Sequence, residues 1–92
     1  MVKLVQIRKH NHTDYRIQNI YLNPEHIIFM SEHHVFKQDL IEGKIKLAID
    51  KSASFTKIKV NENSGFSEIV VIGSPDIIEE KIHSNSKRLL KG

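Results

Sequence analysis

Lysines alternate with apolar residues in two short segments, and this pattern is the sharpest candidate for a binding surface. Successive side chains of a β-strand point to opposite faces, so each segment would carry its lysines on one face and its apolar side chains on the other. If the two segments pair as strands, four ammonium groups form one basic patch that suits the phosphate backbone of DNA or RNA. The candidate nucleic-acid-binding residues are Lys44, Lys46, Lys57 and Lys59, with Arg8, Lys9 and Arg16 as extensions of the patch.

The alternative role of these lysines is to keep an outer sheet face in water and to discourage edge-to-edge pairing with other chains. Nucleic-acid binding also calls for aromatic rings on the same face, because nucleobases stack on them. The aromatic residues that suit this role are Tyr15, Tyr21 and Phe66. The net charge of +3 permits a polyanionic partner without requiring one.

Six histidines raise the question of a metal site. His10 and His12 would point to one side of an extended segment, and His33 and His34 directly follow Glu32. Zinc needs three or four ligands that converge with fixed geometry, and no spacing in this chain matches a known zinc motif. The sequence therefore predicts solvent-exposed histidines, no metal and no other cofactor.

The motifs give no support for catalysis. The chain has no Gly-x-Ser-x-Gly nucleophile turn and no glycine-rich phosphate loop. It also has no cysteine, which removes thiol nucleophiles, thiolate metal sites and disulfides. We therefore expect a protein that is not an enzyme, with no catalytic residues among its scattered carboxylates Asp39, Glu42, Asp50, Glu62 and Glu68.

Length and composition favour one small globular domain. The chain has 92 residues, of which 39% are hydrophobic and 27% charged, as in ordinary folded domains. A secreted domain of this size usually needs disulfides, and the segment Met1–Arg8 resembles no signal peptide. We expect a cytoplasmic protein without a membrane span, because apolar runs such as Ile69–Ile72 are far too short to cross a bilayer.

Apolar alternation predicts mainly β structure, with turns at Asn23–Pro24, Lys51–Ser54 and Asn61–Gly65. In the segment Ser31–Gly43 the apolar positions fit helical spacing with Gly43 as the stop, while a strand and a wide loop stay open as alternatives. The predicted strands are Val2–Arg8, Tyr15–Leu22, Glu25–Met30, Lys44–Asp50, Phe55–Val60 and Phe66–Ile72.

A helix is predicted to close the domain from about residue 75. Ser74 suits the N-cap, Pro75 the first helical position, and Asp76 the positive end of the helix dipole. The apolar face that should dock on the sheet consists of Ile77, Ile78 and Ile82.

The domain is expected to span residues 1–84, followed by a basic and apolar tail over residues 85–92. Arg88, Leu89 and Leu90 in this tail are candidates for docking into a partner groove or a second subunit. The alternative is a frayed end without a partner.

Two stretches resemble the FlbD-like family of small proteins, which is associated with flagella and swarming. Tyr21–Ile28 has a strand, Asn-Pro, an acidic residue and an apolar pair, while residues 56–71 and the segment Ser74–Ile82 are similar to that family's closing hairpin and helix. The resemblance implies a small twisted barrel or half-barrel with a C-terminal helix, a form that small phage and bacterial proteins of unassigned role share. The LytTR-type DNA-binding domain has a looser version of the pattern. Residues 32–50 form an insertion relative to the family.

The expected fold is mainly β (α+β), a small twisted antiparallel sheet or SH3-like half-barrel closed by a C-terminal helix. The expected function is that of a small cytoplasmic regulatory or adaptor protein, phage-encoded or flagella-associated, that works through contacts with a protein partner. Short strands and a small core also favour a homo-oligomer, since pairing would cover strand edges. The alternative is a nucleic-acid-binding regulator that uses the lysine-rich strand face.

Overall fold

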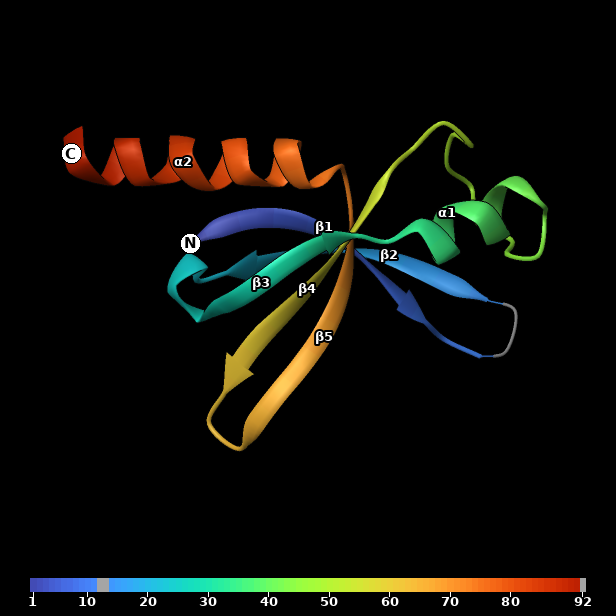
Figure 1. Cartoon of the computed structure of the whole chain (residues 1–92), viewed down its shortest axis with the longest axis horizontal. Coiled ribbons are helices and arrows are strands. Elements are labelled where there is room, and N and C mark those ends of the chain that lie inside the picture. Colours follow the sequence, from blue (N-terminus) through green and yellow to red (C-terminus); the bar gives the residue numbers. More distant parts are fainter. Residues whose placement is uncertain (12–13, 92) are drawn as a thin grey trace.

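The chain folds into five strands and a long C-terminal helix, with a shorter helix and a 3-10 turn between strands (Figure 1). The computed structural model describes residues 1–11 and 14–91, and of residues 85–91 the backbone alone. The strands are β1 (Val2–Lys9), β2 (Tyr15–Leu22), β3 (Ile27–Glu32), β4 (Phe55–Glu62) and β5 (Gly65–Ile72). The helical elements are η1 (Pro24–His26), α1 (His34–Ile41) and α2 (Pro75–Lys91).

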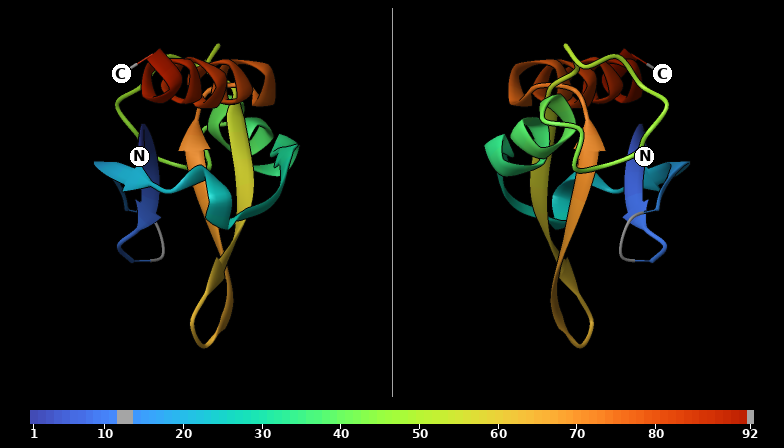
Figure 2. Two further views of the ribbon diagram at one scale, coloured as in Figure 1. Left: turned by 90° about the vertical axis from the view of Figure 1, so that its left-hand side faces the viewer. Right: turned by 90° about the vertical axis from the view of Figure 1, so that its right-hand side faces the viewer.

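The strands form one antiparallel sheet in the order β2-β1-β5-β4-β3. This mainly β sheet with its C-terminal helix confirms the predicted fold class, and the sheet does not close into a barrel. The hairpins β1–β2 and β4–β5 pair along their whole length, but β1 meets β5 only where Gln6 pairs with Val71 and Ile7 with Val70. The two hairpins therefore splay apart, and the β4–β5 hairpin extends alone beyond the rest of the sheet (Figure 2).

The hydrophobic core divides into two clusters on opposite faces of this sheet. Neighbouring residues of β5 alternate between them, since Val71 belongs to the first cluster and Val70 packs against the second. We name the two sides by the helix that covers each. The α2 face carries the cluster Val2, Leu4, Ile58, Val60, Val71 and Ile78, and the α1 face carries the cluster Ile7, Phe36, Leu40, Ile45 and Phe55.

The start of α2 follows the predicted cap. The Ser74 hydroxyl accepts a hydrogen bond from the Ile77 N–H at 3.4 Å, and Pro75 is the first helical residue. Gly73 precedes the helix with a φ of +122°, and a Cβ there would lie 3.2 Å from Cδ1 of Ile78. The close approach lets Ile78 enter the core, where it is fully buried.

One residue of the predicted apolar helix face is not core. Ile78 is buried and Ile82 packs against its cluster, but Ile77 is 49% exposed. Residues four apart share a helix face, whereas Ile77 is rotated about 100° from Ile78, so the prediction for Ile77 is wrong. The backbone of α2 continues through residues 85–91, and the side chains of the tail residues Arg88, Leu89 and Leu90 lie outside the described residues.

The predicted strand at Lys44–Asp50 is wrong. The segment Ser31–Gly43 contains α1 instead of a strand or a wide loop, and Gly43 ends that helix with a φ of +76°. Both edges of β4 are already paired, with β3 and with β5, so no edge beside it receives another strand. Residues 44–54 return as a loop over the α1 face, with one isolated bridge between Lys46 and Asp14.

The alternation in that loop still decides which side chains are buried. Ile45 is buried, Leu47 and Ile49 are half-buried against the same cluster, and the intervening residues are exposed. The Asp50 carboxylate accepts hydrogen bonds from the N–H and the hydroxyl of Ser52, each at 2.8 Å, which lowers the pKa of Asp50. The segment at residues 51–54 is therefore a turn within the loop, because no strand precedes it to form the predicted hairpin.

Two neighbouring isoleucines of α2 provide a matched test of this packing. Ile78→Ala should lower the free energy of unfolding by about 2–5 kcal/mol, because it leaves a cavity in the core. Ile77→Ala, at an exposed position of the same helix, should change it by less than about 1 kcal/mol. Urea denaturation of both variants measures the difference, and equal losses would contradict the described orientation of α2.

Candidate functional site

Each face of the sheet is covered at one end only. The α1 helix and the loop at 44–54 cover the α1 face around Ile7 and Phe55, but the side chains at the far end of β3, β4 and β5 stay open to solvent. There Phe29 is 50% and Phe66 66% exposed. Two exposed phenyl rings near each other on one sheet face form an apolar surface of the kind that can mark a contact site.

The two phenyl rings flank a lysine on the central strand. Lys59 pairs with Phe29 across the β3–β4 ladder, and Phe66 of β5 lies on the diagonal from it. The Lys59 ammonium lies 5.8 Å from the Phe29 ring centroid and 5.1 Å from that of Phe66. We call these three residues the aromatic platform. Each cation–π contact stabilises the arrangement by about 0.5–1 kcal/mol at an exposed site, so the contacts favour these ring positions before any partner binds.

Local sequence explains the position of each ring. Gly65, with a φ of +140°, starts β5 directly after the Asn63–Ser64 turn, so Phe66 is placed near the tip of the projecting hairpin. On β3 the pairing shifts between Ile27 and Phe29, which is a β-bulge at an edge strand. The bulge changes the alternation and brings Phe29 beside Lys59 on the open face. The apolar run Ile27–Met30 suggested a buried strand, so Phe29 was missed as a site residue.

Polar groups border the aromatic platform on β4 and β5. Lys57 is two residues from Lys59 on the same face, as the alternation predicted, and its ammonium lies 3.7 Å from the Glu68 carboxylate. The exposed fractions of these side chains are 38% and 52%, so water screens the pair and it contributes little to stability. The Lys57 ammonium can therefore still bind a second anionic group.

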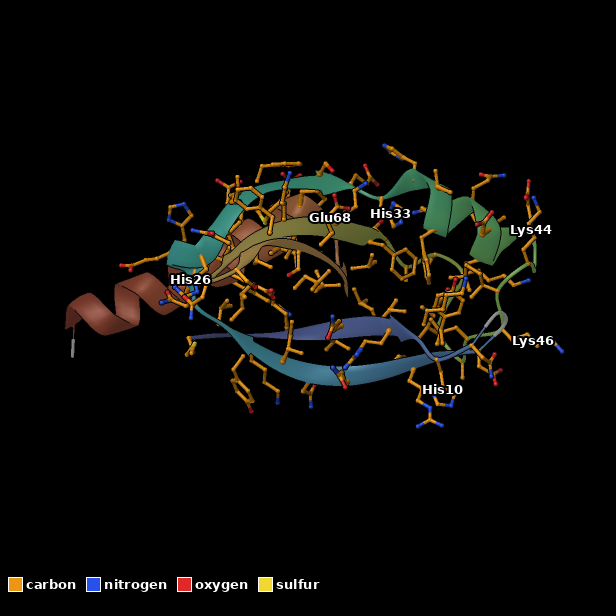
Figure 3. All side chains as sticks on the ribbon, turned by 90° about the horizontal axis from the view of Figure 1, so that it is seen from below. His10, His26, His33, Lys44, Lys46 and Glu68 are labelled. Carbon is orange, nitrogen blue, oxygen red and sulfur yellow. The ribbon has the colours of Figure 1, made fainter. Side chains whose placement is uncertain are left out.

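The structure does not gather the four predicted lysines on one sheet face. Lys57 and Lys59 lie together on β4, whereas Lys44 and Lys46 lie in the loop, at the end of the molecule away from Glu68 (Figure 3). Lys44 also forms an ion pair with Glu42 at 3.0 Å. Hydrogen bonds from Gln38 and then from Lys44 lower the pKa of Glu42, and the Glu42 carboxylate raises the pKa of Lys44.

The predicted aromatic residues have three different environments. Phe66 belongs to the aromatic platform. The Tyr15 ring packs edge-on against Phe36, with centroids 5.3 Å apart, so it is part of the core on the α1 face and unavailable for stacking. Tyr21 is 65% exposed but lies beside α2, where it lines a groove with Met1 and Ile77.

The arginines that were predicted to extend the basic patch also lie apart from Lys57 and Lys59. Arg8 and Arg16 pair with each other across β1 and β2, near the end of that hairpin. Their position in the ladder puts them on the α2 face, opposite to the face of Lys57 and Lys59. The sheet therefore has two separate basic surfaces instead of one.

The histidines are also dispersed. His10 lies 3.2 Å from the Arg16 guanidinium, and His34 lies 3.6 Å from the Glu32 carboxylate on the exposed surface. Within residues 1–11 and 14–91, the structure brings no group of three potential metal ligands together. His12, the other half of the predicted His-x-His pair, lies outside the described residues.

His33 is the histidine with the most distinctive surroundings. It lines a cavity of about 450 Å³ on the α1 face, together with Arg8, Glu68 and others. Its backbone N–H donates a 2.8 Å hydrogen bond to the Phe55 carbonyl, and its imidazole ring stacks on Phe36 with centroids 6.1 Å apart. Partial burial lowers the pKa of His33, and the nearby Lys57 ammonium lowers it further. The ring is therefore neutral at pH 7, a form that can accept or donate a hydrogen bond in the cavity.

Comparison of the chain with protein-family models, with curated proteins and with solved structures finds no match. The resemblance to the FlbD-like family stays a prediction. Over the part of the chain that is described, helices long and apolar enough to cross a membrane are absent.

The lowered pKa of His33 predicts a pH dependence of stability. In the unfolded chain His33 takes up a proton at the ordinary histidine pKa, whereas in the folded chain it does so only at a lower pH. The free energy of unfolding therefore falls as the pH drops below about 6.5. His33→Gln should reduce this loss, whereas His26→Gln, at an exposed position of η1, should leave it unchanged. Urea denaturation at about pH 7.5 and about pH 5.5 measures the change. An equal pH effect in both variants would rule out His33 as its source.

Proposed function

We propose that this protein is a small cytoplasmic regulator that binds single-stranded nucleic acid through the aromatic platform. The observation that supports this most is the Lys59 ammonium held between two exposed phenyl rings on an open sheet face. Modules that bind single strands combine aromatic rings on a sheet with cations that meet the phosphates. Nucleic-acid binding was the alternative function predicted from the sequence. The proposed surface keeps Lys57, Lys59 and Phe66 of the predicted residues and adds Phe29.

Stacking supplies the attraction that the modest charge cannot. Each nucleobase that stacks on an aromatic side chain contributes about 1–3 kcal/mol, with little dependence on base identity. Phe29 and Phe66 stand on the strands either side of β4, so the rings are separated by roughly two strand spacings, or about 10 Å. Two bases of an extended strand could each take one ring, with the phosphates directed to Lys59 and Lys57.

The open geometry favours a single strand over a duplex. Bases within a duplex are stacked on each other and present only their edges, whereas a single strand offers its base faces to the rings. The aromatic platform also lies near a projecting hairpin, which gives an extended strand access from either side (Figure 2). The two lysines contribute few phosphate contacts, so the expected binding is weak to moderate and depends only mildly on salt.

The first experiment measures binding of fluorescent oligothymidine and oligouridine by anisotropy, at about 50 and about 200 mM salt. Phe66→Ala should weaken binding roughly 5- to 100-fold, since it removes one stacking surface. Phe29→Ala should have a similar effect. Lys59→Gln should weaken binding less and reduce its salt dependence.

The loop lysines provide the matched control. Lys44→Gln with Lys46→Gln removes two charges at the far end of the molecule, and it should leave oligonucleotide binding nearly unchanged. If this double variant weakens binding as much as Phe66→Ala does, the attraction is general electrostatics and not the aromatic platform. Absence of binding at low salt would reject the proposal.

A second candidate function is the one the sequence favoured, a regulatory or adaptor role through protein contacts. A groove of about 510 Å³ between α2 and the start of β1 supports it. Three apolar side chains at this groove are solvent-exposed, Met1 by 67%, Tyr21 by 65% and Ile77 by 49%. The charged residues lining it have both signs, Lys3 and Lys81 against Glu80. A surface that carries both signs can complement itself, so the best-fitting occupant is a second copy of this chain.

Sedimentation of the protein over a range of concentrations tests this second candidate. Tyr21→Ser and Ile77→Ser should shift a dimer towards monomer, because they remove apolar area from the interface. Val35→Ser, at a position of α1 that is 67% exposed, should not. A wild-type protein that stays monomeric at the highest concentrations would exclude the dimer.

A further inference from the structure

Two arginines face each other at the end of the β1–β2 hairpin. Arg8 and Arg16 are direct cross-strand partners, and both are exposed. Side chains in such positions start about 4.5–5.5 Å apart at their Cβ atoms, and like charges there destabilise the hairpin. The same face is apolar at Leu4 and Ile20 and polar at Gln6 and Gln18, where the two amides share a 2.9 Å hydrogen bond.

Neither Arg8 nor Arg16 forms an ion pair within residues 1–11 and 14–84. Glu68 lines the cavity at His33 together with Arg8, but its carboxylate pairs with Lys57. The acidic residue in the adjoining loop is Asp14, whose carboxylate accepts a 3.0 Å hydrogen bond from the Asn11 side chain. Asp14 N–H in turn donates to the Asn11 side-chain oxygen at 2.9 Å, so this carboxylate serves to shape the turn.

His10 holds one of the guanidinium groups in position. Its Nε2 lies 3.2 Å from Nη2 of Arg16, and because a guanidinium group can only donate, the imidazole accepts this hydrogen bond through Nε2. The contact orients Arg16 without cancelling its charge. Around it lies a hollow of about 300 Å³, lined by Arg8, Lys9, His10, Arg16 and Gln18. This is a concave surface rich in N–H donors and positive charge.

We propose that Arg8, His10 and Arg16 form a binding site for a phosphate group. Two guanidinium groups offer paired N–H donors that match phosphate oxygens, and the bound anion would offset the repulsion between the arginines. The nature of the phosphate rests on the proposed function: it would belong to a nucleic-acid backbone, as a further contact beyond the phosphates at Lys57 and Lys59. The site itself is separate from the aromatic platform, because it lies on the opposite face of the sheet.

The experiment titrates the full chain with inorganic phosphate at constant ionic strength and follows backbone and arginine side-chain NMR signals. Wild type should show saturable shifts confined to the end of the β1–β2 hairpin. Arg8→Gln and Arg16→Gln should each weaken this binding by about tenfold or more, because each removes charge-assisted hydrogen bonds. Lys51→Gln, which removes an exposed charge from the loop, is the matched control and should bind as wild type does. Equal shifts in Arg16→Gln, or shifts spread over all basic residues, would overturn the site.

Thermal unfolding gives an independent readout. Phosphate stabilises many proteins by exclusion from their surface, an effect that should be equal in all variants. Wild type and Lys51→Gln should gain additional Tm in phosphate relative to chloride, and Arg8→Gln and Arg16→Gln should not. An identical gain in all four proteins would also overturn the site.

Competition separates this inference from the proposed function. If an unlabelled oligonucleotide displaces phosphate from the end of the β1–β2 hairpin, the phosphate site is assigned to a nucleic-acid backbone. If phosphatidylserine vesicles displace phosphate and the oligonucleotide does not, this assignment is overturned. Phe29→Ala with Phe66→Ala should bind inorganic phosphate normally. If the protein binds phosphate but no oligonucleotide, the proposed function is refuted and the phosphate site is retained. If it binds the oligonucleotide but no phosphate, the phosphate site is refuted and the proposed function is retained.

Discussion

Two cross-strand pairs, Gln6 with Val71 and Ile7 with Val70, connect the two hairpins of the sheet, and the rest of the structure depends on this short junction. A longer ladder would hold β1 and β5 in line and give one continuous face. The short ladder lets the hairpins splay, so that the core is split into one cluster on the α2 face and a second cluster on the α1 face, at opposite ends of the sheet. The buried run at the end of β5 serves both clusters, which explains why it is apolar at every position.

This division of the core determines which surfaces stay open. The described residues contain two α-helices, α1 and α2, and each covers one end of one face of the sheet. The uncovered half of the α1 face holds Phe29, Lys59 and Phe66, and the uncovered half of the α2 face holds Arg8 and Arg16. The opposed arginines raise the free energy of the folded chain, and the exposed phenyl rings leave apolar surface in water. A ligand that neutralises the arginines or covers the rings would remove these features, as the proposed binding of nucleic acid requires.

The groove beside α2 has a different chemistry. Its exposed side chains Met1, Tyr21 and Ile77 are apolar, and its charges have both signs. Self-association there would leave the aromatic platform and the arginines accessible, because they lie on other parts of the sheet. The proposed binding of nucleic acid and the proposed dimer are thus compatible, and such a dimer would double the number of binding surfaces along a strand.

The sequence by itself determined most of the local structure. Runs of apolar and β-branched residues located β1 and β5, alternation located β2 and β4, and the Ser74-Pro75 cap located the start of α2. Strand propensity and helix capping depend on residues that are neighbours in the sequence. It also placed Lys57 and Lys59 on the face opposite to Ile58. Only the tertiary structure decided that Lys44 and Lys46 lie in a loop, since the edges of β4 are taken by strands distant in sequence. It likewise decided that Phe29 is exposed and that Arg8 meets Arg16, because a bulge and a register are properties of paired strands and not of either strand alone.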